Sequence, residues 1–481
     1  MMVSSILILL FALLKITLTQ ITIRSPIELQ NKFNGKIKLN TDVIKSSISN
    51  YGKVPYGQSL IGRLYYNVNN KELDYACKPL NGLDIEPETN LDRQPIVLVE
   101  RGNCTFVTKT RMVQRIGGAV ALIVDNKLEK NLENVIMTDD GTGSDIIIPT
   151  LMISKENGQK LIDFFMENKN NTEILSKIQI KLEFSIAHSE KVFFQLFFSS
   201  ANKKIYRLIK EFYSYYVLLK NYTHFTPHYI SHESKLYADD KDIQSDNCLS
   251  NGKYCASPRY DLNVFQGKYI LLEDIRQKCL YNLVTPQGDS SIYFQYMIKF
   301  YDDCIAQVEP RFDYKCALEV LDSIGYDKEK VRQCMINSFG VDKESLLMFN
   351  NTNKLLENDY DAKSAWNVKM FPTIMVNNQT IHGASSAENL VEAVCAGMVT
   401  KPKICEDYLH YSVDNSSEAS DFSFGTIWMI IIAVVLVNVM IVYICKRYIM
   451  RKIHERVERS VDIDGRINNV VTSYLALRDT K

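Results

Sequence analysis

Residues 95–124, PIVLVERGNCTFVTKTRMVQRIGGAVALIV, decide how the first half of this 481-residue chain folds. The run at 95–100 is apolar and ends in the turn RGN at 101–103, as a buried strand does. Residues 108–116 repeat apolar side chains at helical spacing and stop at a glycine pair, which predicts an amphipathic helix. Residues 119–124 form a second apolar run. The stretch therefore predicts the strand–helix–strand unit of an α/β (α+β) protein.

The pattern continues with a third strand at residues 146–153, broken by Pro149, and a helix at 155–166. The order of the pieces, with RGNCTF after the first strand, then GGAVALIVDN and IIIPTLMISKENGQKL, resembles the protease-associated (PA) domain. We expect this domain at residues 20–185, with a polar lead-in before its first strand. The resemblance implies a β-rich, non-catalytic module that binds peptides or covers a protease.

The turn after the first strand is the candidate ligand-binding site of this domain. We predict that Arg101, Gly102, Asn103, Thr105 and Phe106 contact the ligand. An arginine side chain can donate two hydrogen bonds to a carboxylate or a peptide carbonyl, and a glycine-containing turn exposes backbone N–H groups. In the alternative interpretation, Arg101 pairs with a neighbouring acid and supports the fold. A glycan on Asn103 would crowd the site.

Two other stretches carry polar side chains of interest. Asp139, Asp140 and the GTG that follows them predict a surface loop, either solvated or able to order over a ligand. The stretch HFTPHYISH places His224, His228 and His232 four residues apart, but its proline favours an extended segment over a helix. These histidines are either ordinary packed side chains or sensors of acidic pH.

The second half of the chain has a different pattern. An apolar strand at 192–198 and a long aromatic helix at 205–219 are followed much later by the strand MFPTIMV at 370–376, a hairpin and a helix at 387–395. This order is similar to the thioredoxin-like fold. We expect such a domain at residues 186–405.

The thioredoxin-like resemblance implies a cis proline at Pro372, opposite a redox Cys-x-x-Cys pair at the start of the first helix. Residues 199–204 occupy that place and contain no cysteine. No Ser/His/Asp set and no metal-spaced His/Glu cluster is visible in the sequence. We therefore predict that the protein is not an enzyme and uses no cofactor or metal.

Ten of the eleven cysteines precede residue 406, and an even number suits a fully oxidised set. Cys77 and Cys104 are the two cysteines of the PA-like segment, so we predict that they pair with each other, with long-range pairing as the alternative. An insertion at about 240–360 carries six more, and its amphipathic pieces predict helices joined by disulfides. The ten are Cys77, Cys104, Cys248, Cys255, Cys279, Cys304, Cys316, Cys334, Cys395 and Cys405.

The run GTIWMIIIAVVLVNVMIVYIC at residues 425–445 is long and apolar enough to span a bilayer as a helix. Basic residues follow it directly, which predicts a cytosolic tail at 446–481. Residues 1–19 predict a signal peptide and 406–424 a short stalk, so we expect a single-pass type I membrane protein. Six glycosylation acceptors agree with this topology because all precede the span: Asn103, Asn170, Asn221, Asn350, Asn378 and Asn415.

Taken in order, the PA-like segment, FTPHYI, NGKYCA, the cysteine-rich insertion, FPTIMVNN and the single span resemble the vacuolar sorting receptor family. The resemblance implies a receptor that binds propeptide sorting signals of soluble hydrolases in the Golgi lumen and releases them in acidic prevacuolar compartments. We expect it in Golgi, prevacuolar or endosomal, and vesicle membranes. The epidermal-growth-factor-like repeats of the family, often calcium-binding, are not found between this region and the span.

The tail contains the sequence SYLAL at residues 473–477. Tyr474 and Leu477 match the tyrosine-x-x-apolar pattern that clathrin adaptors bind as an extended peptide. We therefore predict hydrolase sorting peptides, clathrin adaptors and the lipid bilayer as partners, and no nucleic acid because the formal net charge is zero. The alternative function is that of a lumenal protein-folding or disulfide-related membrane protein of the thioredoxin-like class without redox cysteines.

Overall fold

The computed structural model describes most of the chain before residue 407. The described residues are 20–33, 43–68, 74–80, 83, 85, 94–128, 132, 135–233, 246–256, 266–307, 310–406 and 446–448. The expected signal peptide, membrane span and sorting motif, and nearly all of the stalk, lie outside them. The chain divides into two compact units, Met1–Leu409 and His410–Lys481. No helix within the described residues is both long and apolar enough to cross a bilayer.

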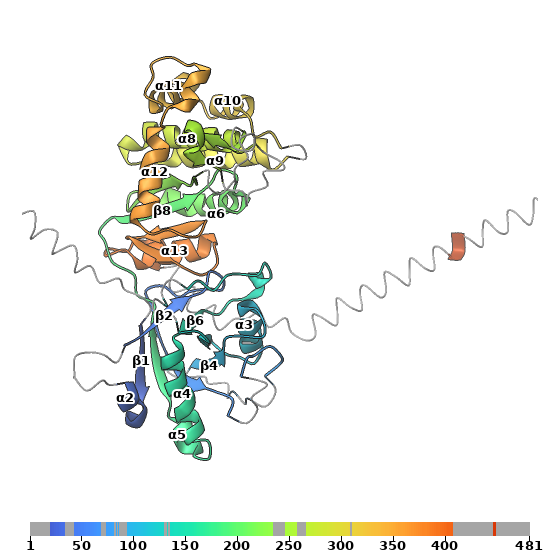
Figure 1. Cartoon of the computed structure of the whole chain (residues 1–481), viewed down its shortest axis with the longest axis vertical. Helices are drawn as coiled ribbons and strands as arrows, with labels where there is room; N and C mark the ends of the chain where they lie inside the picture. The colour runs from blue at the N-terminus through green and yellow to red at the C-terminus, as the bar shows by residue number, and fades with distance from the viewer. Residues whose placement is uncertain are drawn as a thin grey trace, which may run out of the picture. The chain divides into compact units, whose positions relative to one another are not determined.

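The PA segment folds as a closed β-barrel (Figure 1). Around the barrel the strands follow the order β1 (Gln20–Ser25), β2 (Val43–Ile48), β6 (Thr150–Ile153), β5 (Val120–Val124), β4 (Gln94–Glu100), β3 (Ser59–Tyr65) and β7 (Gln179–Glu183). The four strands β3, β4, β5 and β6 run parallel, and the other pairings are antiparallel. Strands β4 and β5 are apolar and buried over almost their whole length, as parallel strands covered on both faces must be.

Four helices and one short turn complete this domain. They are α2 (Ile27–Phe33), α3 (Phe106–Arg115), η4 (Gly143–Asp145), α4 (Lys155–Glu167) and α5 (Thr172–Ser176). The helices predicted at 108–116 and 155–166 correspond to α3 and α4. Thr105 and Ser154 begin them, because each hydroxyl accepts a hydrogen bond from a backbone N–H of the first turn.

The barrel corrects two expectations from the sequence. The polar N-terminal segment expected as a lead-in is part of the barrel, since β1 and β2 pair with each other and close it against β7 and β6. The strand expected at 146–153 covers only Thr150–Ile153. Pro149 has no backbone N–H to donate to a sheet, and the strand begins directly after it.

The thioredoxin-like segment contains a four-stranded sheet in the order β13 (Gln379–Ile381), β12 (Thr373–Val376), β8 (Val192–Phe198) and β9 (Thr223–Tyr229). Helix α6 (Lys203–Leu219) connects β8 to its parallel neighbour β9, and α13 (Ala387–Ala396) follows the hairpin of β12 and β13. The peptide bond before Pro372 is cis, at the position that the resemblance implies. The HFTPHY stretch is the extended strand β9, with alternating buried and half-buried side chains.

The insertion after β9 is helical, as predicted from its amphipathic pieces. Its elements are β10 (Cys248–Leu249), η6 (Ser250–Gly252), β11 (Tyr254–Cys255), α8 (Gly267–Val284), η7 (Thr285–Gln287), α9 (Ser291–Phe300), η8 (Tyr301–Ile305), α10 (Tyr314–Ser323), α11 (Lys328–Ser338), η9 (Leu346–Asn350) and α12 (Lys354–Ala365). Figure 1 shows α10 and α11 beyond α8 and α9, away from the sheet. Helix α12 was not among the predicted helices. It buries only Leu356 and the polar Asp359, so its sequence has no clear apolar stripe.

The ten cysteines before residue 406 form five disulfides. The pairs are Cys77–Cys104, Cys248–Cys255, Cys279–Cys334, Cys304–Cys316 and Cys395–Cys405. The first lies within the PA domain, three hold the insertion, and the last ties the end of α13 to the residues that follow it. Each loop that they close is local to one domain.

Candidate ligand-binding site

The predicted ligand residues lie together on the connection from β4 into α3. Gly102 and Asn103 have positive φ angles of 134° and 64°, so the chain turns sharply after the strand. A Cβ atom at residue 102 would lie 3.2 Å from the Tyr75 ring, so the turn also needs a glycine for close packing. The Thr105 hydroxyl accepts a hydrogen bond from the Thr108 N–H at 3.2 Å and fixes the start of the helix.

Arg101 is partly used by the fold. One guanidinium nitrogen lies 2.9 Å from a carboxylate oxygen of the fully buried Asp125, and the guanidinium carbon lies 5.4 Å from the centre of the Phe106 ring. The pairing with an acid that the alternative interpretation predicts is therefore present. A quarter of the Arg101 side chain is nevertheless exposed, and within the described residues its guanidinium has no second acceptor. Its remaining N–H groups are available to a ligand.

A buried lysine supports the turn from inside the domain. Lys109 Nζ donates hydrogen bonds to the carbonyl oxygens of Tyr75 at 2.6 Å and Gly102 at 2.5 Å. Burial lowers the pKa of Lys109 to about 8. The Cys77–Cys104 disulfide joins the same two chain segments covalently. The lysine and the disulfide therefore both hold the turn that carries the predicted ligand contacts.

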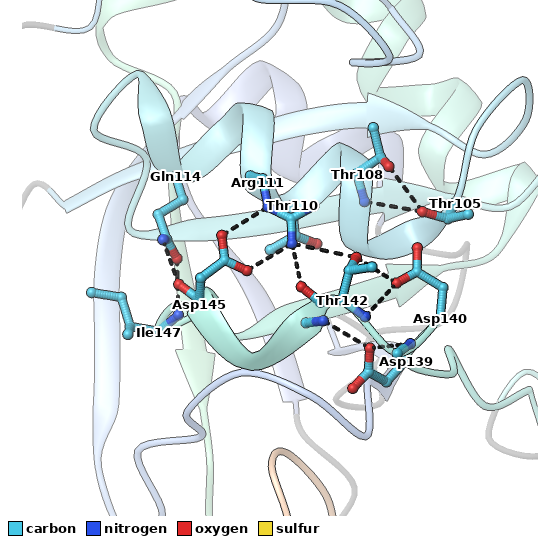
Figure 2. A network of polar contacts seen from close by, with 12 residues as sticks. Thr105, Thr108, Thr110, Arg111, Gln114, Asp139, Asp140, Thr142, Asp145 and Ile147 are labelled. Carbon is cyan, nitrogen blue, oxygen red and sulfur yellow. Dashed lines mark hydrogen bonds and ion pairs between the residues drawn. The ribbon is translucent and has the colours of Figure 1, made fainter. Parts of the chain in front are cut away.

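The acidic loop at residues 139–147 is pinned to α3 by two side chains of the helix (Figure 2). Arg111 holds Asp145 with two parallel contacts, Nε to one carboxylate oxygen at 2.8 Å and a terminal nitrogen to the other at 2.6 Å. Gln114 donates to the Asp145 carbonyl and accepts from the Ile147 N–H, each at 2.9 Å. A two-pronged arginine–carboxylate contact is among the most geometrically specific polar interactions. These contacts fix the position of the loop on α3.

The two acids at the tip of the loop organise it internally. Asp139 accepts hydrogen bonds from the N–H groups of Gly141 and Gly143, both at 2.9 Å. Asp140 accepts from the backbone and the hydroxyl of Thr142 at 3.0 and 2.6 Å. A hydrogen bond from the Thr105 hydroxyl is the largest cause that lowers the pKa of the exposed Asp140 carboxyl. The loop therefore brings a carboxylate to the N-terminal end of α3, next to the predicted ligand residues (Figure 2).

The structure adds residues that the sequence pattern did not single out. Lys109, Arg111 and Gln114 read as the polar face of an amphipathic helix, which normally faces solvent. Asp125 follows the second buried strand and gave no signal by itself. Only the topology could have indicated Asp125. Strands β4 and β5 are parallel neighbours, so the residues after their ends, Arg101 and Asp125, meet at one edge of the sheet.

The thioredoxin-like domain carries no thiol at the position of the redox pair. Asn202 caps α6, and the Ser200 N–H donates a hydrogen bond to Asp274 at 2.8 Å. Burial raises the pKa of Asp274 to about 8. Of the three histidines, His228 is packed: its ring stacks on Phe197 with centroids 4.5 Å apart and bonds to Asp359 at 3.0 Å.

The remaining predicted sites are placed more simply. Five of the six glycosylation acceptors lie within the described residues, and all five side chains are exposed: Asn103, Asn170, Asn221, Asn350 and Asn378. Asn415 and the sorting motif of Tyr474 and Leu477 lie outside the described residues. Where the structure places side chains, no three His, Cys, Asp or Glu residues are grouped as metal ligands.

Comparison with known proteins identifies both domains. Residues 199–395 match the family model of the vacuolar sorting receptor thioredoxin-like domain, and residues 62–161 match that of the PA domain. Vacuolar-sorting receptor 2 of Arabidopsis thaliana is 26% identical over 388 residues, which is 76% of this chain and 59% of that protein. Vacuolar-sorting receptor 1 of Pisum sativum is 27% identical over 384 residues, 75% of this chain and 58% of that protein.

The chain spans less than two thirds of the length of these relatives. Among solved structures, BdbD from Bacillus subtilis aligns with 47% of this chain and 91% of its own at 11% identity and a TM-score of 0.28, which is too low for structural argument. The sequence matches and the observed barrel and sheet agree on the same two domains. Over its PA and thioredoxin-like domains the chain is therefore similar to the vacuolar sorting receptors.

Proposed function

We propose that this protein is a membrane cargo receptor that binds sorting signals of soluble hydrolases in the Golgi lumen and delivers them to a vacuole-like or lysosome-like compartment. The similarity to vacuolar-sorting receptors over three quarters of the chain supports this function. The structure contributes a preformed turn in the PA domain with unused hydrogen-bond donors. That turn is the single observation on which the binding role depends.

We propose that a cargo peptide binds along the turn and the acidic loop. Arg101 would donate to a carbonyl or carboxylate of the peptide, because its guanidinium is only partly engaged by Asp125. Asn103 and Thr105 are exposed beside it, and the partly buried Phe106 ring could add apolar contact. The Asp140 carboxylate on the facing loop favours a peptide that carries a positive charge next to the group bound by Arg101.

A capture experiment tests the binding role. The detergent-solubilised full chain, immobilised at neutral pH, is expected to retain soluble hydrolases from a lumenal extract. The Arg101→Ala variant is expected to retain at least tenfold less hydrolase. Arg115→Ala is the matched control, because Arg115 lies exposed at the far end of the same helix. Recovery of no hydrolase by the unmodified chain, or equal recovery by the two variants, would contradict the proposed site.

For the cytosolic side we propose that Tyr474 and Leu477 bind clathrin adaptors. The support is the motif itself and its place after the expected span. Replacing Tyr474 with Ala is expected to move the protein from Golgi and endosomal membranes toward the cell surface, which fluorescence microscopy of the tagged chain measures. Tyr448→Ala, in the same tail, is the control. An unchanged distribution of the Tyr474 variant would remove the motif from the proposal.

The receptor role also means that the thioredoxin-like domain is not proposed as an oxidoreductase. Its fold alone favours the second candidate, a lumenal folding or disulfide-related protein, but Ser200 and its neighbours offer no thiol at the redox position. An insulin-reduction assay separates the two candidates. We expect no turnover above the rate without protein, and measurable turnover would favour the second candidate.

A further inference from the structure

A short segment of the PA domain, residues 49–58, is built into the thioredoxin-like domain. The Gly383 N–H donates a hydrogen bond to the Ser49 carbonyl, and the Ala384 N–H donates to the Gly52 carbonyl, both at 2.8 Å. We call the contact between residues 49–58 and residues 382–396 the interdomain joint. Its backbone hydrogen bonds resemble those within a single domain rather than those of two modules that touch.

The packing at this joint is close. The Tyr56 hydroxyl donates to the His382 carbonyl at 3.1 Å, and the Tyr56 side chain is 5% exposed. A Cβ atom added at Gly57 would lie 2.8 Å from the Cβ of Ala396, closer than side-chain atoms pack. Val54 is fully buried in the same core cluster as Val391 of the other domain. The two domains therefore share one apolar core at the joint.

The same segment also holds the acidic loop of the candidate ligand site. The Asp139 N–H donates to the Asn50 side-chain oxygen at 2.8 Å, and the Asn50 N–H donates to the Met137 carbonyl at 3.1 Å. Gly52, which accepts from the other domain, would touch the Ile148 carbonyl at 2.4 Å if it carried a Cβ atom. Residues 49–52 are thus bound on one side by the loop and on the other side by the thioredoxin-like domain.

A poorly satisfied carboxyl lies in the middle of the joint. The Glu392 side chain is 1% exposed, and Gln58 donates to one of its oxygens at the long distance of 3.4 Å. Within the described residues the other oxygen has no hydrogen-bond partner, because the Lys53 ammonium is 3.8 Å away. Burial raises the pKa of Glu392 to about 7, Lys53 lowers it, and Glu388 on the same helix raises it slightly.

The pKa values of His382 and Tyr56, which also lie at the joint, are shifted away from neutral pH. Burial lowers the pKa of His382 to about 4, so that histidine stays neutral above pH 5. Burial also raises the pKa of the Tyr56 hydroxyl well above its usual value. Lys53, Glu388 and Glu392 are the charged side chains that these contacts bring together.

We propose that the interdomain joint couples the thioredoxin-like domain to the acidic loop of the ligand site, and that one proton on Glu392 strengthens the joint. The coupling is direct, because residues 49–52 contact both the acidic loop and the thioredoxin-like domain. Only the statement that the loop faces a ligand rests on the proposed function.

The sign of the proton effect follows from the direction of the pKa shift. A carboxyl whose pKa is raised in the closed joint binds its proton more tightly there than in an opened joint. The joint is therefore most stable at low pH and loses stability as the pH rises toward and through about 7. With a Glu392 pKa of about 7 in the closed joint and an ordinary carboxyl pKa in the opened one, the equilibrium shifts away from the closed form by about tenfold between pH 6 and pH 8.

Amide hydrogen exchange of the full chain in detergent tests the proposal without any ligand. At each pH, the intrinsic exchange rate is divided by the measured exchange rate of peptides covering residues 137–147, which gives the protection of the loop. Protection in the unmodified chain is expected to fall severalfold, up to about tenfold, between pH 6 and pH 8. The Glu392→Gln variant cannot ionise, so its protection is expected to change by less than twofold. Glu388→Gln, exposed on the same helix, keeps an ionisable Glu392, so its protection is expected to fall with pH as in the unmodified chain, with the fall moved to lower pH because Glu388 raises the Glu392 pKa.

A second variant guards against misfolding of the first. Lys53→Met removes the cation that lowers the Glu392 pKa, and the loss of protection is expected to move to higher pH. An unchanged pH response in Glu392→Gln, or a response confined to residues 382–396 that leaves 137–147 unaffected, would overturn the coupling. Because no cargo enters the measurement, such a failure leaves the proposed receptor function standing, and failed cargo capture leaves the coupling standing.

Discussion

Lys109 illustrates how one buried charge can set the shape of the turn after β4. Its ammonium donates hydrogen bonds to the carbonyl of Tyr75 and to that of Gly102, which also accepts from the Cys104 N–H. Replacing Lys109 with Met removes the ammonium donor of the Tyr75 carbonyl, whereas the Gly102 carbonyl keeps the Cys104 N–H, and we expect the free energy of unfolding to fall by about 1–3 kcal/mol. Urea unfolding at pH 7 measures this, with Lys155→Met on the exposed start of α4 as the control. Equal stability of the two variants would show that the Lys109 hydrogen bonds contribute nothing net.

The same lysine predicts a pH dependence with the opposite sign to that of Glu392. Its pKa is lowered in the folded protein, so the folded state binds fewer protons than the unfolded state between about pH 8 and the usual lysine pKa. The contribution of Lys109 to stability therefore rises with pH across this window. The difference in unfolding free energy between the unmodified chain and Lys109→Met is expected to grow from pH 8 to pH 10.

At the level of single residues, the sequence indicated some of the site and could not indicate the rest. Arg101, Gly102 and Thr105 stand in a turn motif, which is local and therefore readable. Asp125 and Asp145 reach the same site only because strands and a loop converge in space. Lys109 is buried although lysines rarely are, so its helical pattern favoured a solvated position.

At the level of elements, α3 and the acidic loop behave as one unit. Arg111 holds Asp145, and that contact lowers the pKa of the Asp145 carboxyl, so the pair persists until the pH falls below the usual aspartate range. Replacing Arg111 with Lys keeps the charge but removes the two-pronged geometry. We expect limited proteolysis to cut residues 139–147 several times faster in this variant. Arg115→Lys, one turn further along α3, is the control and should be cut at the unmodified rate.

Elements with strong local patterns were predictable, and those defined by partners were not. The apolar runs of β4, β5 and β8 and the long helix α6 carry their signal in their own residues. Strands β1 and β2 precede the recognisable motif, and only the closure of the barrel against β6 and β7 shows that they belong to it. Helix α12 buries a single leucine and an aspartate, which is too little for a periodic signal.

At the level of the whole molecule, the shared core predicts cooperative unfolding of the PA and thioredoxin-like domains. Gly57→Leu would drive a side chain into Ala396 at the interdomain joint. Gly117→Leu is a matched control in the same domain, because Gly117 also has a positive φ angle but no atom within 4 Å of its Cβ position. We expect calorimetry to show one main transition for the unmodified chain and the control, and two separated transitions for Gly57→Leu. A single transition in all three proteins would mean that the joint does not set cooperativity.

The residues of the joint also bear on how this architecture can change over evolutionary time. A domain whose boundary faces solvent can be exchanged, duplicated or lost with little cost to its neighbour. Here Val54 and Tyr56 belong to one domain by chain order and to the core of the other by burial. A PA domain transplanted from another protein would arrive without the side chains that complete the thioredoxin-like core. The two domains are therefore constrained to be inherited together, with substitutions on one side of the joint answered on the other.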